Sequence, residues 1–383
     1  MTFAPETRSG RLGILMRCLS AYVIRGRATK KPAQINNILI APAGKLGDIV
    51  CATPMFRAVR KAYPQARITL LGNKFTKEVL DNGGLFDDFI EIKSFDETIK
   101  AIKDKKVDFA TLNGTSFILL ATLYLARIPL IAAPIMDSQI EAETFPYKLL
   151  ARFVARATFS VGKYIPAQYL KLLEPIGIHS TDTEKKVGFS DKARQDAQSF
   201  FTKHGLVPKK DRIIGVTLTA GNKIKEWGIE SFAELIRSIV STGGYKVVLF
   251  GSKYDVEASQ ELFKQLQDAT NVIDSAGAFD IDAFKAAISL VDMFIGVDTG
   301  PVYVAEALKI PTIDIVGPVD EREQPPQGPM NMVVKAGREK PAISIFNARK
   351  YDAIEARRQV ESITPAMVFE AFQKLAGIIE KRS

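Results

Sequence analysis

The sequence predicts an α/β protein with two Rossmann-like domains, each built on a parallel β-sheet. Short apolar segments, typical of buried parallel strands, alternate with segments of helical spacing along the whole chain. This alternation begins twice, at residues 37–41 (NILIA) and again at residues 212–217 (RIIGVT). A chain of 383 residues is also long enough for two domains with separate cores. We therefore expect two parallel sheets that face each other across a cleft.

The first half of the chain contains five predicted strands with helices between them. The apolar segments lie at residues 37–41, 67–72, 89–92, 107–112 and 129–133. Helical patterns lie at residues 49–63, 74–81, 95–103 and 116–126. Successive βα units of this kind predict a parallel sheet with right-handed crossovers. Residues 134–177 have a helical pattern richer in Tyr, Phe and Lys, and we expect them to form an insertion.

The second half repeats this order around a segment of linker composition at residues 204–210. Before this segment, residues 184–189 predict a strand and residues 191–203 a helix. After it, strands are predicted at residues 212–217, 246–250, 271–273, 291–297, 311–316 and 332–334. Helices are predicted at residues 229–240, 255–266, 281–290, 302–308 and 364–379. The last helix has a clear start, because Thr364 is a good N-cap and Pro365 suits the first helical position.

Composition indicates a soluble protein of a reducing compartment. Cys18 and Cys51 are too few for a disulfide framework or a zinc site. No apolar run reaches the roughly 18 residues that a membrane span needs, and the N-terminus does not resemble a cleavable signal. We therefore expect the protein to stay in the cytoplasm.

The first 35 residues are expected to form a basic amphipathic leader. Seven Arg and Lys residues lie between residues 8 and 31, and the only acid before Asn36 is Glu6. Apolar residues recur between them at the spacing of one helix face, namely Leu12, Leu15, Met16, Leu19, Tyr22 and Val23. Such a helix can lie on an anionic membrane surface, or it can pack on the following domain. Nucleic acid is not an expected partner, because no binding motif accompanies the charge.

A polar turn follows the strand predicted at residues 291–297. Asp298, Thr299, Gly300 and Pro301 form this turn, and a helical pattern follows. The turn lies at the carboxyl end of a strand, where open α/β sheets bind ligands. Free backbone N–H groups at the helix start would bind an anion, and proline is favoured at the first helical position. The alternative is an ordinary capped helix between two strands.

The loop at residues 42–48 follows the first predicted strand and contains Gly44, Lys45, Gly47 and Asp48. It matches neither a P-loop nor the G-x-G-x-x-G dinucleotide motif, so a dehydrogenase loses its main support. What remains is a glycine loop with one carboxylate. That carboxylate could also simply complement the dipole of the helix that follows.

A third loop, at residues 217–227, ends a strand with small and hydroxyl residues and continues with lysines. Thr219, Gly221 and Lys225 in this loop suit a diphosphate, although the lysines could also be solvated surface residues. The only D-x-D motif, at residues 280–282, is interpreted as a helix start. We therefore expect no required metal ion.

These segments together resemble glycosyltransferase family 9, the ADP-heptose:lipopolysaccharide heptosyltransferases. The similar stretches are the glycine loop ending in Gly47-Asp48, the run Lys225-Glu226-Trp227, and GVDTGPVYVAEAL followed by PTIDIVGP. The resemblance extends over nearly the whole chain from residue 37 onward. The sequence departs from the family pattern in three places. Tyr303 replaces the usual histidine, and Asp255 is shorter than the usual glutamate that meets the donor ribose. Ser344, Asn347 and Arg349 lie where many members have cysteines.

The resemblance implies a GT-B type fold with a site between acceptor and donor domains. Asp48 matches the proposed catalytic base, and Gly44, Lys45 and Gly47 would lie on the acceptor side. The residues expected to bind the donor are Thr219, Gly221, Lys225, Asp255, Asp298, Thr299, Gly300 and Pro301. The expected domains are residues 36–205 on the acceptor side and residues 206–350 for the nucleotide sugar. Residues 351–383 would form a helix that returns to the first domain.

The implied reaction is an inverting, metal-independent transfer of a heptose or related sugar. The donor would be a nucleotide diphosphate sugar, with ADP-heptose favoured, and the acceptor a lipopolysaccharide-type or other lipid-linked saccharide. Such a reaction needs a base on the acceptor hydroxyl and a charge that stabilises the leaving diphosphate. A carboxylate base is expected because the only histidines, His179 and His204, fall in connecting regions. The enzyme would work peripherally at the inner face of the cytoplasmic membrane, without a cofactor.

Two other functions stay open on the sequence. A nucleotide-sugar epimerase can have the same fold, but it would need further acid and base groups around the sugar ring. A nucleotide-sugar-binding protein without catalysis is the second alternative, and the absence of histidine at Tyr303 favours it. Asp48 and Lys225 are present, which argues for catalysis.

Overall fold

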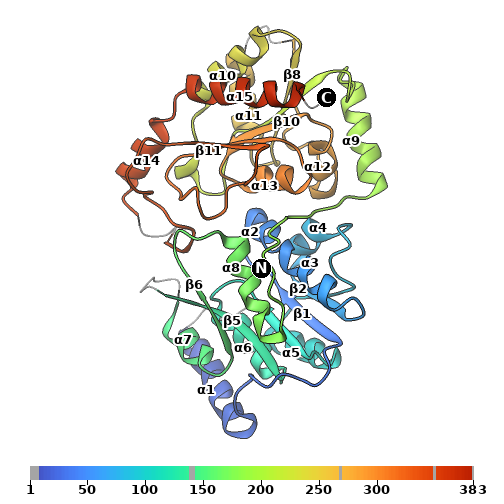
Figure 1. Cartoon of the computed structure of the whole chain (residues 1–383), viewed down its shortest axis with the longest axis vertical. Helices are drawn as coiled ribbons and strands as arrows, with labels where there is room; N and C mark the ends of the chain where they lie inside the picture. Colours follow the sequence, from blue (N-terminus) through green and yellow to red (C-terminus); the bar gives the residue numbers. More distant parts are fainter. Residues whose placement is uncertain (1–7, 138–142, 267–269, 348–350, 382–383) are drawn as a thin grey trace. The chain divides into compact units, whose positions relative to one another are not determined.

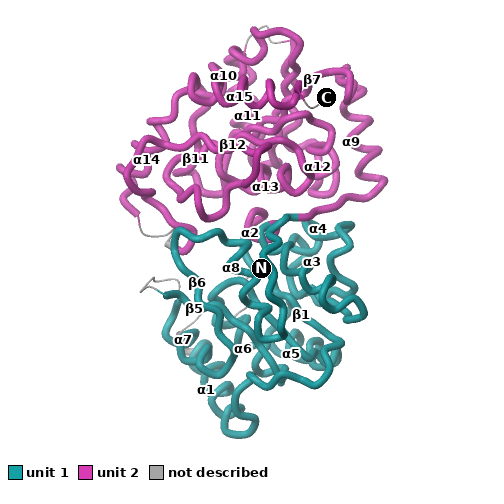
Figure 2. Tube along the Cα trace, in the orientation of Figure 1, with its two compact units in different colours: residues 1–44, 51–185 teal, residues 45–50, 186–383 magenta. Residues whose placement is uncertain are grey.

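The computed structural model describes residues 8–137, 143–266, 270–347 and 351–381, and the chain divides into two compact units (Figures 1 and 2). The first unit comprises residues 1–44 and 51–185, and the second comprises residues 45–50 and 186–383. Each unit contains a parallel sheet of six strands. The two sheets confirm the predicted α/β fold class.

The sheet of the first unit has the strand order β3-β2-β1-β4-β5-β6. Its strands are β1 Asn37–Ala41, β2 Arg67–Gly72, β3 Asp88–Glu91, β4 Phe109–Leu112, β5 Leu130–Met136 and β6 Ala155–Phe159. The central strand β1 pairs with β2 and β4, and Ile38 is in register with Ile68 and Phe109. A strand with helices on both faces of its sheet is buried on both sides, which explains why NILIA is almost wholly apolar.

Helices connect these strands. They are α1 Arg8–Arg25, α2 Leu46–Cys51, α3 Thr53–Ala62, α4 Lys74–Leu80, α5 Phe95–Asp104, α6 Phe117–Leu125, α7 Phe145–Ala151, α8 Ile165–Leu170 and the 3₁₀ helix η1 Lys171–Ile176. A capping box starts α5, because Ser94 accepts from the Glu97 backbone and the Glu97 side chain accepts from the Ser94 backbone. Helix α6 is apolar on nearly every side and is correspondingly buried.

The sheet of the second unit has the strand order β12-β11-β10-β7-β8-β9. Its strands are β7 Arg212–Thr217, β8 Tyr245–Phe250, β9 Val272–Asp274, β10 Met293–Val297, β11 Thr312–Val316 and β12 Asn331–Lys335. Strand order runs outward in one direction from β7 and in the other from β10. The neighbours β7 and β10 therefore form the topological switch point, beside which doubly wound sheets bind ligands.

The helices of the second unit are α9 Asp191–Lys203, η2 Lys223–Lys225, α10 Ile229–Ser241, α11 Val256–Gln265, α12 Ile281–Ile288, α13 Gly300–Ala307, η3 Ile345–Asn347, α14 Ala353–Glu361 and α15 Pro365–Glu380. Asp280 caps α12 by accepting from the Ala283 backbone, so the D-x-D motif starts a helix as expected. Thr364 caps α15 in the same way.

The unit boundary differs from the predicted domain boundary at residues 205 and 206. It falls between Lys185 and Lys186, because α9 packs on α12 of the second unit and buries Phe201. The strand predicted at residues 184–189 has no regular secondary structure. The predicted helical insertion at residues 134–177 contains the strand β6, which pairs with the end of β5. The linker composition of residues 204–210 therefore did not mark the boundary, because α9, which precedes this segment, packs in the second unit.

The predicted terminal segments also differ from the structure. Helix α1 is part of the first unit rather than a separate leader, since Ile14, Leu15 and Cys18 are buried in that unit's core. Helix α15 does not return to the first unit: Phe372 and Leu375 lie in the core of the second, where α15 packs on α10 and β12. The apolar face of α15 covers a sheet face that would otherwise meet water. Residues 1–7 of the predicted leader lie outside the described residues.

Candidate active site

The predicted donor-binding residues gather at the carboxyl ends of β7, β8 and β10 in the second unit. The Thr219–Lys225 loop follows β7, and Asp298 and Thr299 follow β10. These two strands are paired neighbours, with Met293 in register with Ile214. Their order in the sheet, rather than their order in the chain, brings the two predicted motifs together.

Asp298 lies at the centre of a polar network. The residue is 3% exposed, and its Oδ2 lies 2.5 Å from Nζ of Lys225. The hydroxyl of Tyr303 donates to the other carboxylate oxygen, Oδ1. The buried carboxylate therefore has a cation on one oxygen and a hydroxyl donor on the other, which is what a buried charge requires.

The sequence did not show what Tyr303 does in place of the usual histidine, and the structure shows that it is part of this network. It lies on α13, is buried, and reaches back to Asp298 five residues earlier. The hydroxyl stands where the family resemblance predicts an imidazole. The phenol at this position donates a hydrogen bond to the Asp298 carboxylate.

Helix α13 begins within the predicted turn, at Gly300, two residues earlier than expected. Thr299 is the N-cap in an extended conformation, its side chain makes no capping hydrogen bond, and Pro301 lies in the first turn. Packing requires glycine at position 300. A Cβ on Gly300 would lie 2.6 Å from Cβ of Leu46, a separation too short for two carbon atoms.

Gly47 is required by the same packing. A Cβ there would lie 2.7 Å from Cδ2 of Tyr303. Helix α2 and helix α13 thus meet at two glycines, Gly47 and Gly300, within the second unit, because residues Lys45–Val50 belong to it (Figure 2). The glycine loop predicted on the acceptor side is divided: Gly44 belongs to the first unit and Lys45, Gly47 and Asp48 to the second.

Asp48 is half-buried and has a hydrogen bond on each carboxylate oxygen. Oδ2 accepts from the backbone N–H of Lys45 at 2.8 Å, and Oδ1 accepts from Nε2 of Gln324 at 2.9 Å. A carboxylate offers about four lone-pair sites, so two donors orient it and leave capacity for another proton. The side chain of Lys45 donates to the carbonyl of Gly221, which links the α2 loop to the predicted diphosphate loop.

Gln324 is a site residue that the sequence analysis missed. It follows a charged stretch on the loop between β11 and β12, and no spacing or motif marks it. Ion pairs hold this loop: Glu321 contacts Nζ of Lys335 at 2.9 Å and Nη2 of Arg338 at 2.7 Å. The loop is thereby fixed next to Gln324.

Thr219 and Asp255 also come together, as their shared assignment to the donor implies. The hydroxyl of Thr219 donates to Oδ1 of Asp255 at 2.7 Å. Oδ2 of Asp255 accepts from both the backbone N–H and the hydroxyl of Ser252, each at 2.7 Å. The carboxylate is oriented by its own loop.

Trp227 and Arg357 anchor the segment that bears Lys225. The indole Nε1 of buried Trp227 donates to the carbonyl of Ile363 at 2.7 Å. Nη1 of Arg357, on α14, donates to the carbonyl of Glu226 at 3.0 Å. In this Lys-x-Trp segment, Lys225 lies at the candidate site and Trp227, two residues later, holds the segment to the core.

Among the described residues, no group of three or more His, Cys, Asp or Glu side chains could hold a metal ion. Asp298, the most buried carboxylate of the candidate site, has Lys225 beside it instead.

The two parallel six-stranded sheets have the fold of GT-B type glycosyltransferases. A family model described as glycosyltransferase family 9 (heptosyltransferase) matches residues 148–351, more than half of the chain. The chain therefore belongs to glycosyltransferase family 9 and is a glycosyltransferase enzyme.

Similar proteins are known in sequence and in structure. Lipopolysaccharide heptosyltransferase 3 of Escherichia coli K12 is 24% identical over 288 residues, 72% of this chain and 80% of that protein. Lipopolysaccharide heptosyltransferase 2 of Salmonella typhimurium LT2 is 23% identical over 361 residues, 88% of this chain and 98% of that protein. The solved Escherichia coli ADP-heptose lipopolysaccharide heptosyltransferase II aligns with a TM-score of 0.70 at 19% identity, covering 91% of this chain and 100% of that one. This structural likeness is a likeness of fold.

Proposed function

We propose that the protein transfers a heptose from ADP-heptose to a lipopolysaccharide-type or other lipid-linked saccharide. Family membership and the similarity to lipopolysaccharide heptosyltransferases 2 and 3 support this substrate class. The name of the solved heptosyltransferase II supports ADP-heptose as the donor. A related sugar on the same nucleotide would fit the same argument.

Asp48 is the proposed general base. Its carboxylate would accept the proton of the acceptor hydroxyl while that oxygen attacks the anomeric carbon and the diphosphate leaves. Attack from the face opposite the leaving group inverts the anomeric configuration. The observation that supports this role most directly is the orientation of Asp48 by the Lys45 backbone and Gln324, because a base must be held within hydrogen-bond reach of its proton.

Lys225 and the start of α13 are the proposed binding site of the diphosphate. The ammonium of Lys225 supplies positive charge, and the backbone N–H groups that follow Thr299 can donate to phosphate oxygens. Thr219, Gly221, Asp255, Asp298, Gly300 and Pro301 complete the proposed donor site, with Asp255 toward the ribose. Positive charge from Lys225 takes the place that a metal ion has in other sugar transferases, so we propose a metal-independent reaction. Turnover that disappears after dialysis against EDTA and returns with a divalent ion would contradict it.

We propose that the enzyme works in the cytoplasm, at the inner face of the membrane. A lipid-linked acceptor lies in a membrane surface, and residues 8–31 contain seven basic residues and no acid. Contact with an anionic membrane through these residues would bring the site to the acceptor. In the described part of the chain, no helix is long and apolar enough to cross a bilayer.

One experiment separates this function from its rivals. The purified protein is titrated with ADP- and UDP-sugars and then incubated with ADP-heptose, with and without a soluble, deacylated lipopolysaccharide core. Heptose transfer with inverted anomeric configuration, dependent on the core, supports the proposal. Conversion of the nucleotide sugar without acceptor indicates an epimerase, and tight binding without any product indicates a binding protein.

A further inference from the structure

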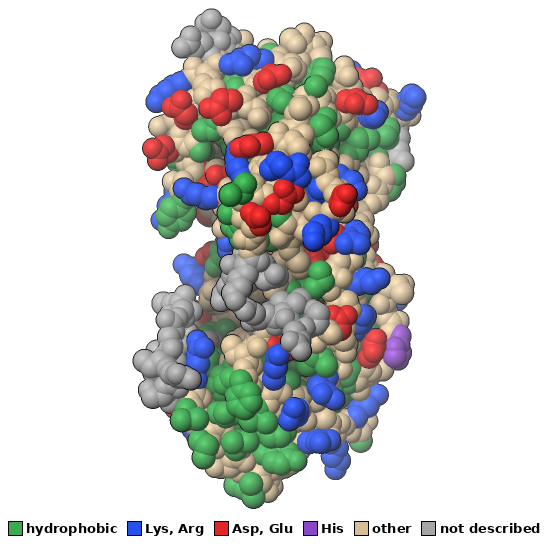
Figure 3. All heavy atoms as spheres, turned by 90° about the vertical axis from the view of Figure 1, so that its left-hand side faces the viewer, with side chains coloured by type: hydrophobic (Ala, Val, Ile, Leu, Met, Phe, Trp, Pro, Cys, Tyr) green, Lys and Arg blue, Asp and Glu red, His purple; other side chains and the backbone are tan. Residues whose placement is uncertain are grey.

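Helix α1 exposes several large apolar side chains although its opposite face is buried. Leu12, Met16, Val23 and Ile24 are 60, 56, 85 and 79% exposed. Figure 3 faces the side of the first unit that bears α1, and hydrophobic side chains gather there with Lys and Arg along one border. Single large apolar side chains are common on protein surfaces. Four exposed ones on the same helix, however, indicate a docking surface.

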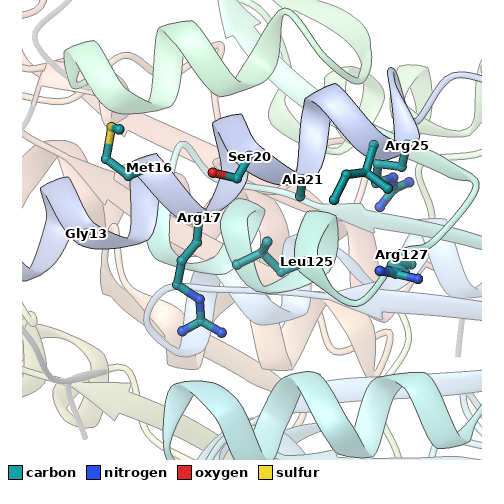
Figure 4. A pocket seen from close by; sticks show the side chains of 9 residues that line it. Gly13, Met16, Arg17, Ser20, Ala21, Arg25, Leu125 and Arg127 are labelled. Carbon is teal, nitrogen blue, oxygen red and sulfur yellow. The ribbon is translucent and has the colours of Figure 1, made fainter.

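A hollow of about 410 Å³ lies between α1 and the end of α6. Its lining combines this apolar face with arginines: Gly13, Met16, Arg17, Ser20, Ala21, Ile24, Arg25, Leu125 and Arg127. In Figure 4, Arg25 and Arg127 lie together at one end of the hollow, Arg17 points into the space from α1, and Leu125 lies opposite the helix. The lining of the hollow is thus partly apolar and partly cationic, with two arginines together at one end.

The arginines differ in how much of their charge is already compensated. Nη2 of Arg17 contacts Asp96 at 2.6 Å, but both side chains are more than half exposed, so water weakens the pair and the arginine can change partner. Arg25 donates to the carbonyls of Tyr124 and Ile128, which have no net charge. Burial lowers the pKa of Arg25, the nearby Tyr124 opposes this effect, and repulsion from the exposed Arg127 lowers the pKa further.

An anion between Arg25 and Arg127 would relieve that repulsion. Arg17, Arg25 and Arg127 line the hollow, and among the described residues that line it there is no Asp or Glu, although Arg17 pairs with Asp96 beside it. Arg11, Arg27 and Lys30 are exposed on the same segment and add positive charge. An apolar face beside a cationic rim complements a leaflet of acidic phospholipids, in which charged phosphates lie at the surface of the hydrocarbon.

We propose that α1 docks on a membrane in a defined orientation, with Leu12, Met16, Val23 and Ile24 in the leaflet and the phosphate of an acidic phospholipid between Arg25 and Arg127. This inference deepens the membrane contact proposed above and rests on it. The structure changes which residues take part: Leu15 faces the core, so it cannot enter the leaflet, whereas Ile24 can. A helix of 18 residues lying flat would extend for about 27 Å along the surface.

The test uses surface substitutions in the full chain, since deleting α1 would also remove Ile14, Leu15 and Cys18 from the core. Binding is measured by co-sedimentation with vesicles of phosphatidylcholine alone and of phosphatidylcholine and phosphatidylglycerol in equal parts. Arg127→Gln should weaken binding to the anionic vesicles about fivefold and leave binding to the neutral vesicles unchanged. Met16→Ser with Ile24→Ser should weaken binding to both kinds of vesicle at least about tenfold.

Matched controls separate this surface from general charge and hydrophobicity. Arg156→Gln removes an exposed arginine of the first unit outside the hollow, and Phe263→Ser removes an exposed phenylalanine on α11. Both should bind vesicles as the parent chain does. Equal losses in the controls, unchanged binding by Arg127→Gln or by the double variant, or no binding by the parent chain would each overturn the proposal. A parent dimer that the double variant dissociates, without any vesicle binding, would assign the face to a second copy instead.

The docking proposal and the proposed function can fail separately. Nucleotide binding and heptose transfer to the deacylated, soluble core are measured on the same preparations. Vesicle binding without transfer would refute the proposed reaction but keep the docking surface. Transfer with no vesicle binding would refute the docking surface alone.

Discussion

Nζ of Lys225 lies 2.5 Å from Oδ2 of Asp298, in a pair that is 18% and 5% exposed at its two side chains. The two residues are 73 positions apart, on loops that follow the neighbouring strands β7 and β10. A cation so placed neutralises a buried carboxylate and can still reach a ligand from its exposed side. Each residue is therefore expected to affect both stability and donor binding.

Replacing Lys225 with Ala should weaken donor binding by about 1.5–3 kcal/mol, because a charge-assisted contact to the diphosphate is lost. It should also lower the melting temperature, because Asp298 remains buried without its cation. Calorimetric titration with ADP measures the first effect and thermal unfolding the second. Lys264→Ala, at an exposed lysine on α11, is the control. Unchanged ADP affinity in Lys225→Ala would place the ammonium outside the donor site.

Replacing Asp48 with Asn should lower kcat roughly 10²–10⁴-fold, the usual effect of removing a general base. The amide is close in size but cannot take the acceptor's proton, and donor Kd should stay within a few-fold because the base acts in the transition state. Steady-state turnover and ADP titration of one preparation measure both. Asp191→Asn, in the first turn of α9, removes a comparable helix-terminal carboxylate and should leave turnover intact. Near-normal turnover of Asp48→Asn would contradict the mechanism but not the fold.

Gln324→Glu should shift the acid limb of the kcat–pH profile to higher pH, on the order of one pH unit. The new carboxylate would stand next to Asp48, and a like charge favours the protonated form of its neighbour, which cannot act as a base. Gln327→Glu adds the same charge three residues further along the loop, on an exposed side chain. An equal shift in both variants would mean that the loop's net charge, and not the contact with Asp48, is responsible.

Tyr303→Phe should lower the free energy of unfolding by about 1–3 kcal/mol, since the buried Asp298 loses its hydroxyl donor. Tyr147→Phe is a matched control, because Tyr147 is also buried and its hydroxyl donates to the Pro134 carbonyl at 2.6 Å in the first unit. Urea unfolding should show losses of similar size in both variants, whereas only Tyr303→Phe should weaken ADP binding. If Tyr147→Phe weakens ADP binding as much, the effect is one of global stability.

Protonation of Glu321 in acid should lower the stability of the protein. Burial acts to raise the pKa of Glu321, but hydrogen bonds from Lys335, from its own backbone and from Arg338 outweigh burial and lower it from 4.5 to about 2. Because the folded pKa is the lower one, the contribution to stability is complete above about pH 4.5 and is lost as pH falls toward 2.

Glu321→Gln should therefore lower the free energy of unfolding by roughly 1–3 kcal/mol at pH 7 and by less at pH near 3. Urea unfolding at the two pH values measures the difference. Glu355→Gln is the control, since Glu355 also has a pKa of about 2 but is exposed, so water screens its pair with Arg358. A pH-independent loss in Glu321→Gln would indicate that packing, and not the charge, is lost.

The sequence predicted helices and strands correctly where residues next to one another in the chain determine the structure. The Asp298–Pro301 turn was predicted because a buried apolar strand, a polar break and a helix-favouring proline lie in succession. The start of α15 was predicted because Thr364 and Pro365 act on the backbone next to them. The family and its enzyme class also followed from the sequence, since the motifs around Asp48, Lys225 and Asp298 are contiguous in the chain.

Tertiary structure alone decided which distant residues meet. Gln324 reaches Asp48 across 276 positions, and Lys225 reaches Asp298 across 73; neither contact has a local signal in the sequence. The same holds for α1, α9 and α15. Amphipathic spacing shows that each helix has an apolar face, but which surface buries that face depends on the shape of the whole core. Spacing is a property of neighbours in the chain, whereas packing is a property of neighbours in space.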